Sequence, residues 1–81
     1  MDGIHLHILS PEGTLVETDV ELVTLPGAAG SFTVLKDHAP LVSALTEGRV
    51  RYVSAGKESF QPIQGGFVRI GNNTVTVAVE C

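Results

Sequence analysis

Residues 25–51 read LPGAAGSFTVLKDHAPLVSALTEGRVR, and the interpretation of the whole chain begins from this stretch. It contains a glycine-punctuated segment, a short apolar run, an Asp-His-Ala-Pro corner, a second apolar run and a Glu-Gly turn. One proline and two glycines within residues 26–30 predict a loop, because such a segment suits a β-ladder poorly. Residues 41–45 have some helical spacing, but the run between Pro40 and Gly48 is too short for a stable helix, so we expect extended structure.

The rest of the chain shows the alternation of apolar and polar residues that is typical of half-buried strands. Turn-forming residues separate the alternating segments, and about eight short strands at spacings of roughly eight to twelve residues indicate an all-β sandwich or flattened barrel. Pro62 suggests an edge strand or a bulge. Gly65-Gly66 predicts close approach of two backbones or a kink. The clearest strands are residues 4–9, 14–17, 19–25, 31–35, 49–54, 58–64, 67–70 and 74–79.

Length and composition limit the classes of protein to consider. Eighty-one residues, 43% of them apolar, make a single domain over residues 1–81. The net charge of −4 disfavours a nucleic-acid binder, and one cysteine, Cys81, excludes an internal disulfide. The acidic start lacks the features of a signal peptide and no apolar run is long enough to cross a bilayer, so we expect a soluble, cytosolic chain.

Three patterns suggest catalytic or ligand-binding chemistry, each with a simpler explanation. His5 and His7 leave the same strand face, and His38 or carboxylates could complete a metal site, but a polar strand face that uses histidine is favoured. Asp37-His38 near Ser31 or Ser43 suggests a hydrolase, yet no nucleophile elbow is present. The glycine-rich segment 27–31 lacks the Gly-Lys-Ser/Thr ending of a phosphate loop, and it is either a protein-contact loop or a connecting turn.

A fourth pattern defines the alternative function. Lys57 at a hairpin tip of a small β-domain could be the attachment point of biotin or lipoate, as in carrier domains. Its neighbours are ordinary turn residues, and intact-mass measurement would reveal an adduct. Against these patterns, the apolar residues outnumber what one sheet face needs, which indicates a surface covered by a partner. The chain is therefore predicted to be a binding module.

Several motifs in order carry a resemblance to a known family. They are Leu6-x-Ile8-Leu9-Ser10-Pro11-Glu12, Leu25-Pro26-Gly27, Gly30-x-Phe32-x-Val34-Leu35, His38-Ala39-Pro40-Leu41, Leu45-x-x-Gly48-x-Val50 and Gly65-Gly66-Phe67. Together they span the chain, and the sequence resembles the epsilon subunit of the F-type ATP synthase. The resemblance implies a flattened ten-stranded β-sandwich at the foot of the central stalk, with no active site and no cofactor.

The resemblance also implies partners and a location. A single copy would clamp the gamma subunit, rest on the c-ring and transmit torque, peripheral to the cytoplasmic face of the bacterial inner membrane. The expected c-ring contacts are Gly27, Ala28, Ala29, Gly30, Ser31 and Phe32, with Ser31 at the tip. The expected gamma contacts are Ser10, His38, Ala39, Pro40, Val42 and Ser43.

Two departures from the family pattern modify these expectations. Many relatives carry an acidic residue where Ser31 stands, so hydrogen bonding or backbone contact must replace a charge pair there. Most relatives continue into a two-helix domain that inhibits ATP hydrolysis and in some species binds ATP. Because this chain stops at Cys81, we expect neither property.

Overall fold

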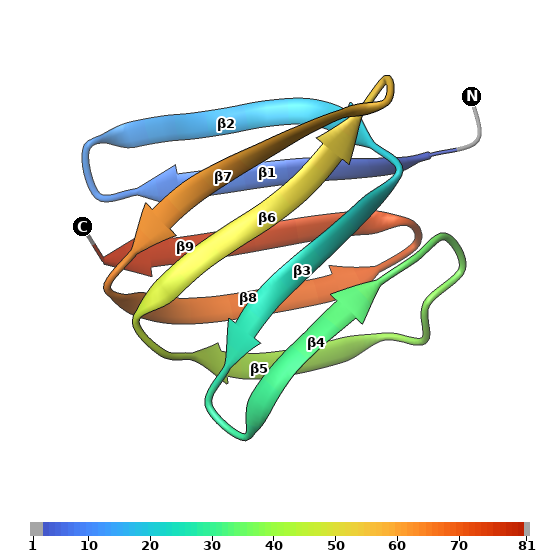
Figure 1. The fold of residues 1–81 in the computed structure, drawn as a ribbon. Helices are drawn as coiled ribbons and strands as arrows, with labels where there is room; N and C mark the ends of the chain where they lie inside the picture. The colour runs from blue at the N-terminus through green and yellow to red at the C-terminus, as the bar shows by residue number, and fades with distance from the viewer. Residues whose placement is uncertain (1–2, 81) are drawn as a thin grey trace.

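The computed structural model describes residues 3–80, which form nine β-strands and no helix (Figure 1). It follows that no helix in this range could cross a membrane. The strands are β1 (Ile4–Ser10), β2 (Gly13–Val20), β3 (Leu22–Gly27), β4 (Gly30–Val34), β5 (Leu41–Leu45), β6 (Gly48–Ser54), β7 (Lys57–Ile63), β8 (Gly65–Gly71) and β9 (Thr74–Glu80).

The strands form one continuous sheet that curls into two layers. Its order is β2-β1-β9-β8-β5-β3-β6-β7, and β4 pairs with the other edge of β3. The first layer consists of β2, β1, β9, β8 and β5, and the second layer, which crosses it, consists of β4, β3, β6 and β7 (Figure 1). Every pair is antiparallel except β1 and β9, which run parallel.

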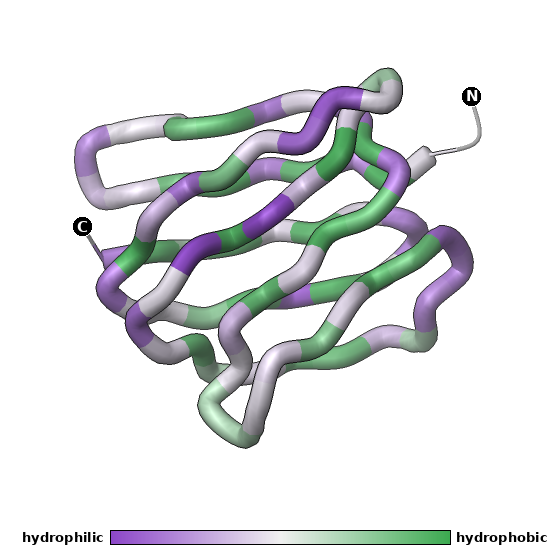
Figure 2. The backbone as a smooth tube through the Cα atoms, viewed as in Figure 1, coloured by the Kyte–Doolittle hydropathy of each residue, from purple (hydrophilic) through white to green (hydrophobic). Residues whose placement is uncertain are grey.

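The core lies between the two layers and is entirely apolar. Apolar and polar residues alternate along most of the strands (Figure 2), so each strand turns one row of side chains inward. Ile4, Leu6 and Ile8 of β1 are buried, as are Val75, Val77 and Val79 of β9. No polar or charged side chain is buried among the described residues.

The all-β prediction is confirmed, as is the extended structure of residues 41–45. The described residues contain nine strands where the resemblance implied ten. Pro62 does lie on an edge strand, β7. Gly66 does allow close backbone approach, because a Cβ atom there would lie 2.0 Å from the Ala78 carbonyl oxygen. Cys81 lies outside the described residues.

The predicted loop at residues 26–30 is wrong. Pro26 and Gly27 belong to β3 and pair with Ser31 and Gly30, which leaves only Ala28 and Ala29 in the turn. The Pro26 carbonyl accepts the Thr46 N–H at 2.8 Å, so the proline takes part in the sheet as an acceptor although it has no N–H to donate.

The predicted strands at 14–17 and 19–25 are divided differently in the structure. β2 extends to Val20, β3 begins at Leu22, and the chain passes from the first layer to the second at Glu21. Glu21 fixes this crossing, since its N–H donates to the Val53 carbonyl at 2.7 Å and its carboxylate accepts the Gly56 N–H at 3.2 Å.

Candidate protein interface

The outer face of the first layer presents exposed apolar side chains, Phe67 and Val42, next to charged groups. Because Ile4, Leu6 and Ile8 face the core, His5, His7 and Leu9 must face outward. The same alternation holds on the neighbouring strands, and the pairing registers align the outward side chains into rows that run across the strands.

One of these rows is apolar. Leu9 pairs with Ala78, Ala78 with Phe67, and Phe67 with Ala44, so four apolar side chains follow one another across β1, β9, β8 and β5. We call this set the apolar row. Phe67 is 63% exposed, so the other described residues cover little of it. Such exposure is unusual for a phenylalanine.

The next row along the strands is mostly polar. Glu17 pairs with His7, His7 with Thr76, Thr76 with Arg69, and Arg69 with Val42, which is 69% exposed. We call this set the charged row. Among the described residues, none of the ion pairs involves Arg69, whereas Arg51 on the second layer is paired with Glu58.

A histidine held between two carboxylates lies at the β2 edge of this face. His5 Nδ1 lies 3.0 Å from Asp19 Oδ1, and His5 Nε2 lies 3.2 Å from Glu17 Oε2. A neutral imidazole can donate from only one nitrogen, so both contacts are satisfied together only by the imidazolium. The hydrogen bonds to Asp19 and then to Glu17 accordingly raise the pKa of His5 above its ordinary value.

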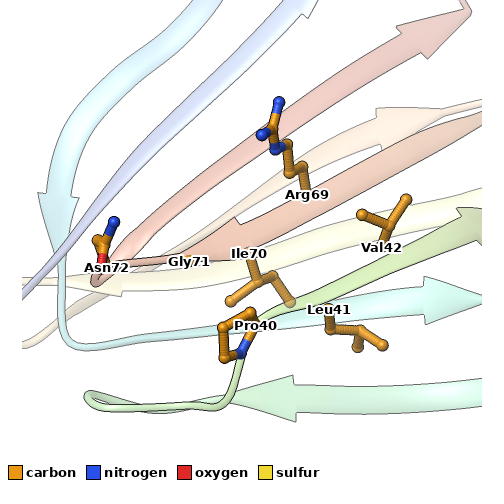
Figure 3. Close-up of a pocket in the computed structure, with 7 residues that line it drawn as sticks. All are labelled: Pro40, Leu41, Val42, Arg69, Ile70, Gly71 and Asn72. Carbon is orange, nitrogen blue, oxygen red and sulfur yellow. The ribbon is translucent and has the colours of Figure 1, made fainter.

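A shallow hollow of about 460 Å³ opens at the opposite edge of the face, beside β5. Pro40, Leu41 and Val42 form one wall (Figure 3). Figure 3 shows Arg69 and Val42 extending to one side of the sheet, while Leu41 and Ile70 extend to the other. The remaining lining residues are Gly71 and Asn72.

The corner before β5 is held in place by the β8–β9 turn. The Asp37 N–H donates to Asn73 Oδ1 at 2.6 Å, and Asn73 Nδ2 donates to Asp37 Oδ1 at 3.2 Å. Both residues have positive φ angles, 65° and 56°, which suits Asp and Asn better than most side chains. The Asn73 carbonyl also accepts the His5 N–H at 2.9 Å, so one turn residue joins the corner to β1.

The metal and hydrolase hypotheses gain no support from these positions. No group of three His, Cys, Asp or Glu residues within 3–80 is placed to hold a metal ion, and His7 hydrogen-bonds Thr14 at 3.1 Å. His38 Nδ1 donates to the Ala39 carbonyl and Ser43 Oγ to the Ala44 carbonyl, so each uses a neighbouring backbone group. Modification of Lys57, which is exposed beside the β6–β7 turn, stays a prediction.

Comparison with known proteins identifies the family. The model of the ATP synthase delta/epsilon chain β-sandwich domain matches residues 3–81. The chain belongs to this family.

Two relatives illustrate how the chain compares with other epsilon chains. An ATP synthase epsilon chain of Desulfitobacterium hafniense is 39% identical over 75 residues, which cover 93% of this chain and 57% of that relative. The epsilon chain of Caulobacter vibrioides is 36% identical over 80 residues, covering 99% of this chain and 93% of its own length. This chain therefore spans little more than half of the Desulfitobacterium protein but most of the Caulobacter protein.

Solved structures show the same fold. A chain in the Euglena gracilis mitochondrial ATP synthase, a structure of OSCP, F1 and c-ring, superimposes with a TM-score of 0.90 at 22% identity, covering 98% of this chain and 51% of that one. A chain in the Tetrahymena thermophila mitochondrial ATP synthase central stalk and c-ring has a TM-score of 0.81 at 14% identity, covering 98% of this chain and 64% of that one.

The residues that the sequence predicted to contact the gamma subunit do not lie together in one cluster. Val42 and Pro40 line the hollow beside β5, and the corner with His38 and Ala39 lies next to it. Ser10 lies at the far end of the same layer, beside Leu9 and Phe67. Ser43 pairs with buried Val68, so it lies on the core-facing side of β5.

The structure adds interface candidates that the sequence reasoning missed: Leu9, Phe67, Arg69 and Ala78. The position of the two large apolar side chains, Leu9 and Phe67, in the alternation of their strands could have identified them. The core-facing residues of β1 are the even-numbered Ile4, Leu6 and Ile8, so Leu9 must face away from the core. The core-facing residues of β8 are Val68 and Ile70, so Phe67 must also face away from it.

The expected c-ring contacts form the β3–β4 hairpin. Ala28, Ala29, Gly30 and Ser31 are exposed, but Gly27 is buried, and a Cβ atom there would lie 2.9 Å from the half-buried Phe32 ring. Ser31 is not at the tip, because its pairing with Pro26 places it within β4. The tip is Ala28-Ala29, and the Ala28 N–H donates to the Ala44 carbonyl at 3.0 Å.

Proposed function

We propose that this chain is the β-sandwich domain of a non-catalytic central-stalk subunit of F-type ATP synthase. In this role it binds the gamma subunit through the outer face of the first layer and the c-ring through the β3–β4 hairpin. It thereby couples proton translocation to ATP synthesis as one copy per complex. It would be peripheral to the membrane, on the cytoplasmic face of the bacterial inner membrane.

The apolar row is the observation that carries this proposal. Burying one large apolar side chain is worth roughly 1.5–3 kcal/mol, so a small domain that leaves Phe67 of this row and Val42 of the neighbouring charged row more than half exposed gives up substantial stabilisation unless a partner covers them. The row lies on regular strands rather than on loops, which favours a flat, rigid interface.

The sandwich also suits a part that passes force between two partners. Each strand of the first layer pairs along most of its length, and β1–β9 pairing joins residues about seventy positions apart in the chain. Such a sheet resists bending, because a displacement at one strand must break ladder bonds to its neighbours. The hairpin is tied through Ala28 to Ala44 of β5 and through Pro26 to Thr46 just after that strand, so force on its tip reaches the first layer directly.

The ring-facing contact would rely on small, uncharged groups. The Ala28 N–H already donates to the Ala44 carbonyl, so the tip offers the other backbone groups of Ala28 and Ala29, and Ser31 is exposed on the adjoining strand. Where relatives are expected to place a carboxylate, this chain can provide hydrogen bonds with less dependence on salt.

A membrane pulldown tests the proposal. A tagged chain expressed in its native cells should co-purify with gamma and c-ring subunits from detergent-solubilised membranes. Phe67→Ser should reduce recovery of gamma. The matched control is Phe60→Ser, which removes a 45% exposed phenylalanine from the outer face of the second layer. Equal recovery of gamma with both variants, or no gamma with the wild type, would contradict the proposal.

A further inference from the structure

The charges on the first-layer face are arranged in a pattern that a partner must match. Carboxylates of Glu17 and Asp19 lie on β2, at one edge. The Arg69 guanidinium lies on β8, three strands away across β1 and β9. With neighbouring strands about 4.8 Å apart, the backbone positions of Glu17 and Arg69 are about 14 Å apart.

The surroundings of Arg69 explain why its charge matters for binding. Val42 is its partner on β5, and Phe67 of the apolar row is two residues away on β8, so both border it on the outward side. A partner that covers the apolar row must also cover Arg69. A guanidinium taken out of water without an acceptor is strongly unfavourable, and none of the described ion pairs supplies one from within this chain.

The β2 edge poses the complementary requirement. Glu17 and Asp19 share one histidine, His5, so two carboxylates meet at most one positive charge. The next strand, β9, adds no charge here, because His5 pairs with Thr74 and His7 with Thr76. This edge therefore favours a cation on the partner.

We propose that the first-layer face recognises a protein surface with an apolar ridge, a carboxylate opposite Arg69 and a basic residue opposite Glu17 and Asp19. Under the function proposed above, on which this inference rests, that surface belongs to the gamma subunit. The apolar row supplies most of the buried area, and the two charges fix the orientation and the register of the contact. Arg69 is thus a specificity-determining residue of the interface.

Charge reversal at Arg69 separates this pattern from simple apolar docking. The probe is an ATP synthase preparation that retains gamma but lacks this subunit, immobilised, with the chain and its variants binding from solution. Arg69→Glu should weaken binding by on the order of 10-fold to 100-fold, with a slower association rate at low salt, and Arg69→Gln should weaken it less. Lys57→Glu is the matched control, because it reverses an exposed charge on the β6–β7 hairpin away from the face, and it should change affinity by less than about twofold.

Phe67→Ser, measured beside these variants, distinguishes failure of the pattern from failure of the function. If Phe67→Ser weakens binding and Arg69→Glu does not, the charge pattern is wrong and the interface stands. If the wild type binds and neither variant is weaker, both the pattern and the interface are wrong. All four substitutions are at exposed positions, and unchanged thermal midpoints would confirm that the variants fold. If Arg69→Glu unfolds, Arg69→Gln decides the outcome.

Discussion

Gly66 provides a sharp stability test, because the space for a side chain there is already occupied by backbone. A Cβ atom would lie 2.0 Å from the Ala78 carbonyl oxygen and 2.9 Å from the Val79 Cα. Neither neighbour is a flexible side-chain end, so the β8–β9 ladder must open to admit a methyl group. The φ angle of +143° is also one that alanine rarely adopts.

The two costs can be added approximately. A residue held in such a backbone region costs on the order of 1–3 kcal/mol. Disrupting one or two ladder hydrogen bonds adds about 1 kcal/mol each. Gly66→Ala should therefore lower the free energy of unfolding by roughly 2–5 kcal/mol, a large share of the ~4–12 kcal/mol expected for a domain of this size.

Gly71→Ala is the matched control on the same strand. A Cβ atom at Gly71 would have no neighbour within 4 Å, and its φ angle is not in the positive range, so the substitution should change stability by less than about 1 kcal/mol. Urea unfolding followed by far-ultraviolet circular dichroism measures both. Equal midpoints for the two variants would refute the reasoning.

Three further predictions concern His5 between its two carboxylates, the Asp37–Asn73 contact at the corner before β5, and the core residue Leu6. The pKa of His5 in the folded protein is raised above its ordinary value of 6.5, so the charged His5 stabilises the fold fully below pH 6.5 and this stabilisation is lost as the pH rises through the folded-state pKa. The urea midpoint of the wild type should therefore fall over this pH range, and the fall should be smaller in His5→Gln. Asn73→Gly keeps the positive φ angle but removes the side-chain amide that bonds Asp37, and it should lower the free energy of unfolding by about 1 kcal/mol. In a double-mutant cycle with Asp37→Gly, the two losses of stability should not add, because both substitutions remove the same hydrogen bonds. Leu6→Ala in the fully buried core should cost roughly 2–5 kcal/mol by the same unfolding assay.

Local sequence patterns predicted the class of the fold because each strand carries its own alternation. The shared face of Val75, Val77 and Val79 follows from their spacing alone, and the Asn72-Asn73 turn follows from its residue types. Pro26 and Gly27 misled the prediction, because composition cannot show that the Pro26 carbonyl would find the Thr46 N–H across the sheet.

The candidate interface was harder to predict because it depends on pairing between distant segments. Leu9, Ala78 and Phe67 become neighbours only through the parallel β1–β9 pair and the β8–β9 hairpin. Nothing local in the chain specifies the first of these pairings. The two-residue turn at Ala28-Ala29 likewise depends on the β3–β4 register. That register places Ser31 within β4, whereas the sequence-based expectation had it at the tip.

Site-specific photocrosslinking in the assembled synthase tests which face of the sandwich binds gamma. A photoreactive amino acid would be placed in turn at Val42 on the first-layer face, at Ala29 on the hairpin tip, and at Phe60 on the second layer as a control. We expect crosslinks from Val42 to gamma and from Ala29 to the c-ring, with none from Phe60 to gamma. Crosslinks to gamma from Phe60 and not from Val42 would contradict this expectation.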